Sequence, residues 1–250
     1  ETGKMLLKEC AKTVKKVSME LGGLAPFIVF EDANIEAAIA GAIAAKYRNT
    51  GQTCVCANRI YVHQDIYDEF CEGFTKAAAK IQTGEGLDPA TDQGPLIDEA
   101  ALAKVEEHIN DAQNQGGLIL LGGRRHKLGG LFFEPTVIKD ANDAMLIAHE
   151  ETFGPVAPLF SFATEEEVIA RANDTPFGLA SYFYTTDLAK SWRVAEQLEY
   201  GMVGLNTGIV STEMAPFGGI KESGMGREGS KYGVEDYLEI KYISIAGIDR

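Results

Sequence analysis

The sequence predicts an α/β protein built around a largely parallel sheet. Short apolar runs alternate with longer amphipathic segments along the 250-residue chain, and this alternation is typical of helices packed on a parallel sheet. Glycine, proline or acidic residues bound the short runs, as they bound buried strands. With 45% hydrophobic residues, the chain is large enough for a substantial core and one or two domains.

The first predicted elements follow in order. Residues 4–16 predict a helix, and residues 26–30 (PFIVF) predict a buried strand. Asp32 or Asn34 can cap the next helix, and residues 59–63 predict the following strand. The apolar faces of the two helices in this region are predicted at Ile35, Ile39, Ala42 and Ile43, and at Ile66, Phe70, Phe74, Ala77, Ala78 and Ile81.

The rest of the chain continues this alternation. The stretch 84–96 is rich in Gly, Pro and Asp and predicts a long irregular segment. A helix over 97–114 and a strand over 117–123 follow, and TEEE at 164–167 is a capping box that opens another helix. Further strands are predicted at 179–184, 201–206 and 238–248, with a helix over 187–198. The last strand has no helix after it, so its edge stays exposed unless it pairs.

Charge and composition exclude several classes of protein. The net charge of −14 argues against a nucleic-acid or anionic-membrane partner. No apolar run approaches the roughly 20 residues of a membrane span, and the N-terminus lacks the features of a signal peptide. Four cysteines do not make a disulfide scaffold, so we expect a reducing, intracellular compartment. Because the chain opens without methionine and inside a predicted helix, we expect it to belong to a longer protein.

The stretch RNTGQTCVCANR, from Arg48 to Arg59, holds two cysteines with three possible roles. A metal site is poorly supported, because structural zinc usually needs four ligands and the histidines are scattered. Simple packing is common for free cysteine, but this stretch is polar and turn-like. A nucleophile fits best, since cationic neighbours such as the two arginines favour the thiolate. Its base is a histidine in a Cys–His hydrolase, or a carboxylate.

Three further stretches, taken with the cysteine loop, carry a family resemblance. They are MELGG at 19–23, EETFGP at 150–155 and PFGGIKESGMGREG at 216–229. In this order and spacing they resemble the aldehyde dehydrogenase superfamily over essentially the whole chain, as the C-terminal, catalytic half of a family member. The details are most similar to succinate-semialdehyde dehydrogenases: Arg48 six residues before Cys54, a second thiol at Cys56, and NTGIVSTEMAPFGG.

The resemblance implies covalent catalysis with NAD or NADP. Cys54 attacks the aldehyde carbon to give a thiohemiacetal, hydride passes to the nicotinamide, and water activated by Glu20 hydrolyses the thioester. Glu151 is implied to hold the nicotinamide ribose, because a carboxylate accepts two hydrogen bonds. Phe153 is implied to lie against the nicotinamide ring, and Leu21 to meet its amide through the backbone.

The resemblance also implies how the substrate binds. Arg48 and Ser211 match the residues that grip the substrate carboxylate in succinate-semialdehyde dehydrogenases, where a guanidinium binds bidentately. Phe217 matches a wall of the substrate tunnel. The alternatives are a solvated arginine at a helix end and a phenylalanine that only packs. Cys56 either forms a reversible disulfide with Cys54 or packs.

Two features depart from the family pattern. The chain begins inside the Gly-rich turn of the family's cofactor domain, so the upstream asparagine of the oxyanion hole is absent. Because losing such a donor costs roughly 100- to 1,000-fold in rate, we expect the chain alone to be inactive. The residues that distinguish NAD from NADP are absent as well. Leu24 stands where many members carry Asn or Lys.

The resemblance therefore implies an aldehyde dehydrogenase-like catalytic domain in three parts. Residues 1–23 are the remnant of a truncated upstream dinucleotide-binding domain, 24–237 the catalytic domain, and 238–250 an oligomerisation strand that pairs within a homodimer or homotetramer. The implied substrate is a small aldehyde bearing a carboxylate, in the cytoplasm or the mitochondrial matrix, and no metal is expected. Alternatives are a dehydrogenase for glutarate semialdehyde or a neutral aldehyde, a non-catalytic domain of this fold, and a thiol hydrolase.

Overall fold

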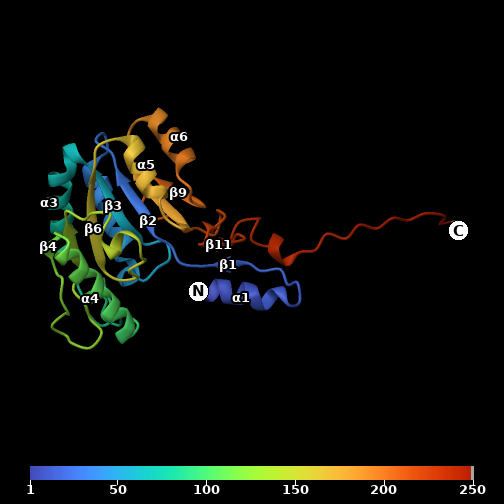
Figure 1. Cartoon of the computed structure of the whole chain (residues 1–250), viewed down its shortest axis with the longest axis horizontal. Helices are drawn as coiled ribbons and strands as arrows, with labels where there is room; N and C mark the ends of the chain where they lie inside the picture. The colour runs from blue at the N-terminus through green and yellow to red at the C-terminus, as the bar shows by residue number, and fades with distance from the viewer. Residues whose placement is uncertain (249–250) are drawn as a thin grey trace.

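A seven-stranded sheet with helices on both faces forms the body of the computed structural model, which describes residues 1–248 (Figure 1). The strand order is β4-β5-β6-β3-β2-β8-β9, and every neighbouring pair is parallel except β4 with β5. The strands are β2 (Ala25–Val29), β3 (Ala57–His63), β4 (Leu118–Leu121), β5 (Thr136–Lys139), β6 (Val156–Phe162), β8 (Ala180–Tyr184) and β9 (Met202–Leu205). The predicted α/β class with a largely parallel sheet is confirmed.

Alternate side chains of the central strands pack into two hydrophobic cores on opposite faces of this sheet. In β2, Phe27 and Val29 join one core and Ile28 joins the other, which follows from the two-residue period of a strand. The first core is covered by α2 (Ile35–Tyr47) and α3 (Tyr67–Ala78), and the second by α4 (Glu99–Asn114), α5 (Glu165–Asn173) and α6 (Leu188–Gln197). Both faces are covered, as parallel sheets require.

Polar side chains begin the helices where the sequence predicts caps. Asn34 accepts a hydrogen bond from the first turn of α2 at 2.9 Å, so it is the cap rather than Asp32. At α5, Thr164 accepts from the N–H of Glu167, whose carboxylate returns to the N–H of Ala163. These bonds satisfy N–H groups that have no partner within the helix.

The predicted apolar face of α2 is only partly correct. Ile35, Ile39 and Ile43 are partly buried, whereas Ala38 and Ala42 are completely buried. The small alanines let the helix lie close to the sheet, while the isoleucines pack at the margin of the core. The face of α2 that contacts the sheet is therefore centred on Ala38, Ala42 and Ala45 rather than on the isoleucines.

The N-terminal segment forms a small layer beside the main sheet. Helix α1 spans Thr2–Ala11, shorter than the predicted 4–16, because Val14 adopts a left-handed conformation with φ 53°. After this turn, β1 (Met19–Glu20) pairs with β11 (Gly224–Met225). A second short pair joins β7 (Phe177–Gly178) to β10 (Ile220–Lys221). The two pairs bring 216–229 next to the stretch that contains Glu20.

The predicted C-terminal strand does not form within this chain. Residues 238–248 run away from the body without regular structure (Figure 1), and Ile240, Tyr242 and Ile243 are exposed. A strand needs a partner strand for its hydrogen bonds, and no described segment supplies one here. Pairing with a neighbouring subunit stays a prediction, and residues 249–250 of the predicted segment lie outside the described residues.

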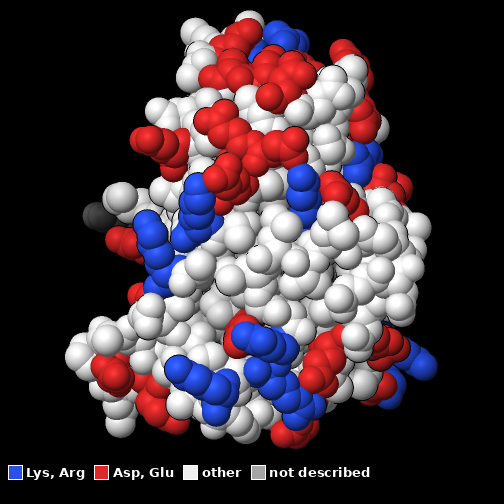
Figure 2. Space-filling model, turned by 90° about the vertical axis from the view of Figure 1, so that its left-hand side faces the viewer, with Lys and Arg blue, Asp and Glu red and all other residues white. Residues whose placement is uncertain are grey.

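The surface and helix lengths bear on possible partners. Among residues 1–248, no helix is both long and apolar enough to cross a bilayer. On the face shown in Figure 2, Lys and Arg form separate groups divided by a broad uncharged area, and acidic side chains gather toward the top of the view and also lie beside the basic groups. That face therefore presents no continuous basic surface.

Candidate active site

The loop between α2 and β3 carries Cys54 and is fixed by several contacts. Its first turn places Asn49 and Thr50 at positive φ, 51° and 61°. Thr50 donates to the carbonyl of Gly94, and the Gln52 side chain donates to the carbonyl of Pro95 and accepts from the N–H of Ile97. The irregular segment 84–96 thus supports the cysteine loop.

The stretch after Glu20 lies between Cys54 and Glu151. A Cβ added to Gly23 would lie 2.5 Å from the carbonyl oxygen of Cys54, and one on Gly22 would lie 2.7 Å from Oε2 of Glu151. The N–H of Gly23 donates to Oε1 of Glu151 at 3.1 Å. Three stretches far apart in sequence therefore meet through a glycine pair that leaves no room for side chains.

Glu20 has the properties of a general base. Its pKa is raised to about 7, first by burial and then by the charge of Glu228, while Arg227 opposes the shift. Its Oε2 atom is buried and has no hydrogen-bond partner among residues 1–248. A carboxyl group that exchanges a proton near neutral pH is suited to activating a thiol or a water molecule.

The Cys54 thiol is half-buried and neutral at rest. Burial raises its pKa, as do the negative charges of Glu20 and Glu151, while the N–H groups of Cys54 and Val55 act in the opposite direction. The two carboxylates therefore oppose a resting thiolate, and the thiol needs a base when it attacks. Glu20 is one of the two carboxyl groups whose charge reaches the thiol.

The predicted help from Arg59 is wrong, because its side chain points elsewhere. The guanidinium is 1% exposed and donates to the carbonyls of Leu24, Arg171 and Ala172 and to the hydroxyl of Tyr200. It therefore ties the end of the glycine stretch to the C-terminus of α5. Its role is structural, and it lies away from the sulfur of Cys54.

Glu151 and Phe153 fit the cofactor role that the motif implies. Burial raises the pKa of Glu151 to about 7, against the N–H of Gly23 and the charges of Lys104 and Lys46. Its second oxygen, Oε2, accepts no hydrogen bond from any described residue. The Phe153 ring is 37% exposed, and its backbone is left-handed with φ 53°. A free carboxylate oxygen and an exposed ring two residues further along the chain suit the hydroxyls and the ring of a nicotinamide riboside.

Leu21 is placed by neighbours on both sides. Its N–H donates to the carbonyl of Ser223 at 3.0 Å, and its side chain packs so closely on α1 that a Cβ on Gly3 would lie 2.5 Å from its Cδ1 atom. The N–H is therefore occupied in this structure. Contact with a nicotinamide amide through the Leu21 backbone stays a prediction.

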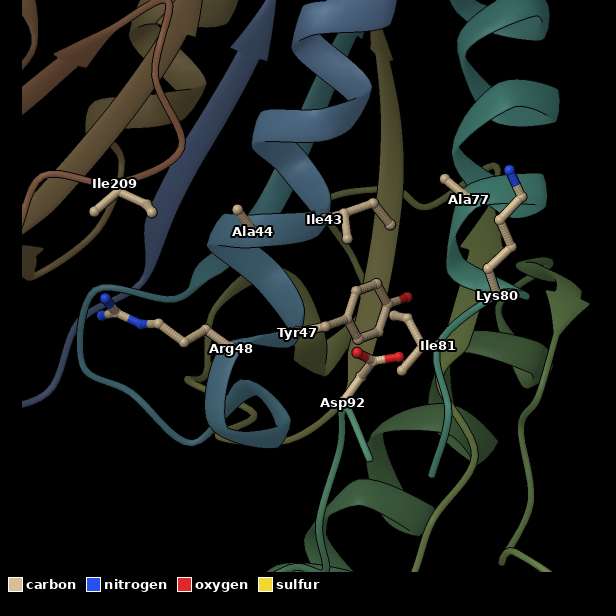
Figure 3. A pocket seen from close by; sticks show the side chains of 9 residues that line it. All are labelled: Ile43, Ala44, Tyr47, Arg48, Ala77, Lys80, Ile81, Asp92 and Ile209. Atoms are coloured by element: carbon tan, nitrogen blue, oxygen red, sulfur yellow. The ribbon is translucent and has the colours of Figure 1, made fainter. Parts of the chain in front are cut away.

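Arg48 borders a cavity of about 410 Å³ at the end of α2. Figure 3 shows its side chain extending toward Ile209, away from Tyr47 and Asp92. Within residues 1–248 its guanidinium forms no ion pair, and neither Cys54 nor Glu20 lines the cavity. Burial raises the pKa of Cys56, and the positive charge of Arg48 is among the influences that oppose this shift. Arg48 is thus an available cation beside the cysteine loop.

The loop that carries Ser211 lies against α2. A Cβ on Gly208 would lie 2.0 Å from the carbonyl oxygen of Gly41, and Ile209 lines the same cavity as Arg48. Ser211 is exposed. The fold therefore brings the two predicted carboxylate-binding residues to the same side of α2, and their joint contact with a substrate stays a prediction.

Phe217 and Cys56 both contact the core. Phe217 is partly buried against the α2–α3 side of the sheet, and its backbone pairs with Glu228. Cys56 is 1% exposed, and its thiol lies 3.4 Å from the carbonyl oxygen of Lys46. Both Cys54 and Cys56 are free thiols here. A tunnel wall at Phe217 and a disulfide at Cys56 stay predictions.

Tyr182 is a site residue that the sequence pattern did not reveal. It is 1% exposed on β8, and its hydroxyl donates to the carbonyl of Val55, between the two cysteines, at 2.8 Å. A strand tyrosine is usually a core residue, so only the three-dimensional structure shows that it fixes the loop. In the described part of the chain, no three side chains converge as metal ligands.

The fold brings together a half-buried thiol at Cys54, a glutamate with a pKa of about 7 at Glu20 and a second carboxylate at Glu151. This arrangement is typical of cysteine-dependent enzymes. The family model described as "Aldehyde dehydrogenase family" matches residues 1–243. The chain belongs to the aldehyde dehydrogenase family.

Similar proteins differ in the aldehyde for which they are named. The chain is 60% identical over 248 residues to 3-sulfolactaldehyde dehydrogenase of Pseudomonas putida, and 61% identical over 248 residues to glutarate-semialdehyde dehydrogenase of Pseudomonas aeruginosa; each match covers 99% of this chain and 51% of the relative. It is 60% identical over 245 residues to succinate-semialdehyde dehydrogenase [NADP(+)] of Escherichia coli, covering 98% of this chain and 51% of that protein.

Solved structures show the same fold. A structure described as an E. coli NADP-dependent enzyme superposes with a TM-score of 0.96 at 60% identity, covering 97% of this chain and 50% of the other. Succinate-semialdehyde dehydrogenase from Burkholderia pseudomallei superposes with a TM-score of 0.96 at 57% identity, with the same coverage. The chain thus spans about half the length of the relatives it matches. Its placement in their C-terminal half stays a prediction from the motifs.

Proposed function

We propose that the protein to which this chain contributes oxidises succinate semialdehyde to succinate with NAD or NADP. Arg48 carries this proposal, as an unpaired guanidinium beside the cysteine loop. Arg48 is exposed, and an arginine without a carboxylate partner is ready to bind one bidentately. Similar proteins are named for succinate and glutarate semialdehydes, and both compounds carry a carboxylate at the far end from the aldehyde.

In the proposed mechanism, the thiol of Cys54 adds to the aldehyde carbon, and its proton passes to the carboxylate of Glu20. The chemistry supplied by bound NAD or NADP is acceptance of the hydride that leaves this thiohemiacetal, so that a thioester remains on Cys54. Glu20 releases this proton to solvent and, as a carboxylate again, takes a proton from the water molecule that attacks the thioester. The acid then leaves, and the thiolate of Cys54 regains its proton from Glu20. Splitting one difficult step into two is the benefit of covalent catalysis.

The remaining residues position the reactants. Glu151 offers its Oε2 atom, and Phe153 its exposed ring, to the nicotinamide end of the cofactor. Arg48 and Ser211 bind the carboxylate of the substrate, and Phe217 limits the space beside it. Residues 1–23, 24–237 and 238–250 then act as part of the cofactor domain, the catalytic domain and an intersubunit strand. We place the enzyme in the cytoplasm or the mitochondrial matrix as a homo-oligomer.

The test compares an acidic with a neutral aldehyde in the full-length protein that contains this chain. We expect kcat/KM for succinic semialdehyde to exceed that for butanal, and Arg48→Ala to lower the first value roughly 10²-fold while leaving the second nearly unchanged. Lys80→Ala is the matched control, because Lys80 is an exposed cation that lines the same cavity. Equal use of both aldehydes by the wild type would refute the acidic substrate.

Glutarate semialdehyde is the second candidate, favoured by the relatives named for it. It carries the same carboxylate one methylene further from the aldehyde. The same experiment decides between them, because the better substrate is the one with the higher kcat/KM in the wild type. Absence of turnover with any aldehyde would instead favour a non-catalytic role.

A further inference from the structure

The segment that carries Glu151 and Phe153 is held by one stripe of α4. Asp111 accepts a hydrogen bond from the N–H of Leu146 at 2.7 Å. His108 lies 3.0 Å from the hydroxyl of Thr152, measured from Nδ1. Val105 meets the far end, where a Cβ on Gly154 would lie 2.4 Å from its Cγ2 atom. Residues three apart share one helix face, so the helix contacts this segment at regular intervals.

His108 is the polar centre of this contact. Both His108 and Thr152 are buried, at 0% and 1% exposure, so their hydrogen bond is shielded from water. The other ring nitrogen, Nε2, lies 3.5 Å from a carboxylate oxygen of Glu150 and has no hydrogen-bond partner among the described residues. Leaving the buried hydroxyl of Thr152 without a hydrogen bond would cost free energy of folding. The His108 ring is therefore held in the orientation that keeps this hydrogen bond.

The residue after Thr152 is in a strained conformation. Phe153 has φ 53°, which a bulky residue adopts only when its surroundings enforce it. On one side Thr152 is fixed by His108. On the other side Gly154 is wedged between Val105 and Gly51, since a Cβ on Gly51 would lie 2.2 Å from the carbonyl oxygen of Gly154. Both neighbours of Phe153 are therefore immobilised by side chains or backbone outside the segment.

We propose that His108 is a positioning residue, which through its hydrogen bond to Thr152 keeps Phe153 left-handed and holds Glu151 and Phe153 in place for the cofactor. This inference rests on the proposed function for the identity of the ligand, a nicotinamide dinucleotide. His108 itself touches neither the cofactor nor the substrate. It fixes Glu151 and Phe153, which do contact the cofactor, relative to α4.

The shape of the histidine ring gives a sharp test in the full-length protein. An asparagine amide occupies nearly the place of Nδ1, whereas a glutamine amide occupies nearly the place of Nε2. His108→Asn should therefore keep the bond to Thr152, and His108→Gln should lose it. Thr152→Val removes the same bond from the other side with little change in volume. His63→Gln is the control, because His63 is a buried histidine whose Nε2 lies 3.1 Å from the carbonyl oxygen of Ala163.

Two readouts separate positioning from general damage. The first is the affinity for cofactor, measured as KM and as the rise in melting temperature on adding NAD or NADP. The second is hydrolysis of p-nitrophenyl acetate without cofactor, which reports the thiol of Cys54. We expect His108→Gln and Thr152→Val to raise the cofactor KM on the order of tenfold, equivalent to about 1.4 kcal/mol. Their double variant should be no worse than either, since both break one interaction.

His108→Asn and His63→Gln should stay within about threefold of wild type, and ester hydrolysis should be unchanged in all four single variants. Equal losses in the Asn and Gln variants, an unchanged cofactor KM in both, or parallel loss of ester hydrolysis would overturn the inference. If the wild type oxidises no aldehyde, the proposed function fails, and the melting-temperature rise with cofactor still decides for His108. A wild type whose melting temperature neither cofactor changes would overturn both.

Discussion

Replacing Glu151 with glutamine should stabilise the protein above neutral pH and leave its stability in mild acid unchanged. Burial is the main reason that the pKa of this carboxyl rises from 4.5 to about 7. Between these values the folded state retains a proton that the unfolded chain has lost. The free energy of unfolding therefore falls as pH rises through this window, and it is lowest above pH 7. Glutamine has no charge to bury, and its carbonyl oxygen can still accept from the N–H of Gly23.

The size of the effect follows from the same shift. A tenfold change in proton affinity corresponds to ~1.4 kcal/mol, so moving a pKa from 4.5 to about 7 corresponds to about 3.5 kcal/mol at most. Glu151 is partly exposed, and solvent reduces the cost, so we expect about 1–3 kcal/mol at pH 8. In a unit of 250 residues, each kcal/mol raises the melting temperature by about 2–4 °C.

The assay is thermal unfolding of wild type and Glu151→Gln at pH 5 and pH 8, at one protein concentration and without cofactor. The variant should melt higher than wild type at pH 8, and the two should nearly coincide at pH 5. Glu166→Gln is the control, because Glu166 is an exposed acid in α5. A melting-temperature difference that is the same at both pH values would refute the reasoning, since it would show that ionisation of Glu151 is not what destabilises the fold.

Two further predictions concern catalysis in the full-length protein. The rate of aldehyde oxidation should rise with pH through about 7 as Glu20 becomes a carboxylate. Glu20→Gln should abolish this rise and lower kcat by roughly 10²- to 10⁴-fold. An unchanged pH profile in the variant would rule Glu20 out as the base. Gly23→Ala should lower kcat on the order of 10²-fold, because its Cβ would lie 2.5 Å from the carbonyl oxygen of Cys54 and displace the nucleophile. Gly86→Ala serves as its control, since nothing lies within 4 Å of a Cβ there, and equal rates in the two variants would contradict the close approach.

Sequence patterns predicted five of the seven strands of the main sheet and missed β5 and β6, which lie between β4 and β3. The runs at β2 and β3 are apolar and clearly bounded, so their strand character is unambiguous. β6 contains Pro158, and a proline within a run argues against a central strand. In the structure Pro158 lies opposite Ile138 of β5, with β3 on the other side. β5 has four residues, of which only Val137 and Ile138 are apolar, so its apolar run is shorter than those of β2 and β3.

In the candidate site, residues that belong to a sequence motif were predictable and the others were not. Glu20, Cys54 and Glu151 were chosen because each belongs to a short motif, and the fold brings them together. His108 and Tyr182 belong to no motif, and their spacing is that of ordinary core residues. Their partners, a threonine hydroxyl and a main-chain carbonyl, lie 44 and 127 positions away. No local pattern encodes a contact of that kind, so only the folded chain reveals it.

The hydrogen bonds of Arg59 have a consequence for how this sequence can vary. Three of its acceptors are main-chain carbonyls, at Leu24, Arg171 and Ala172, and every amino acid supplies a carbonyl. Mutational drift at those positions therefore leaves the connection intact, whatever side chain stands at position 24. Position 59 has no such freedom, because a lysine ammonium lacks the planar fork that reaches all three carbonyls.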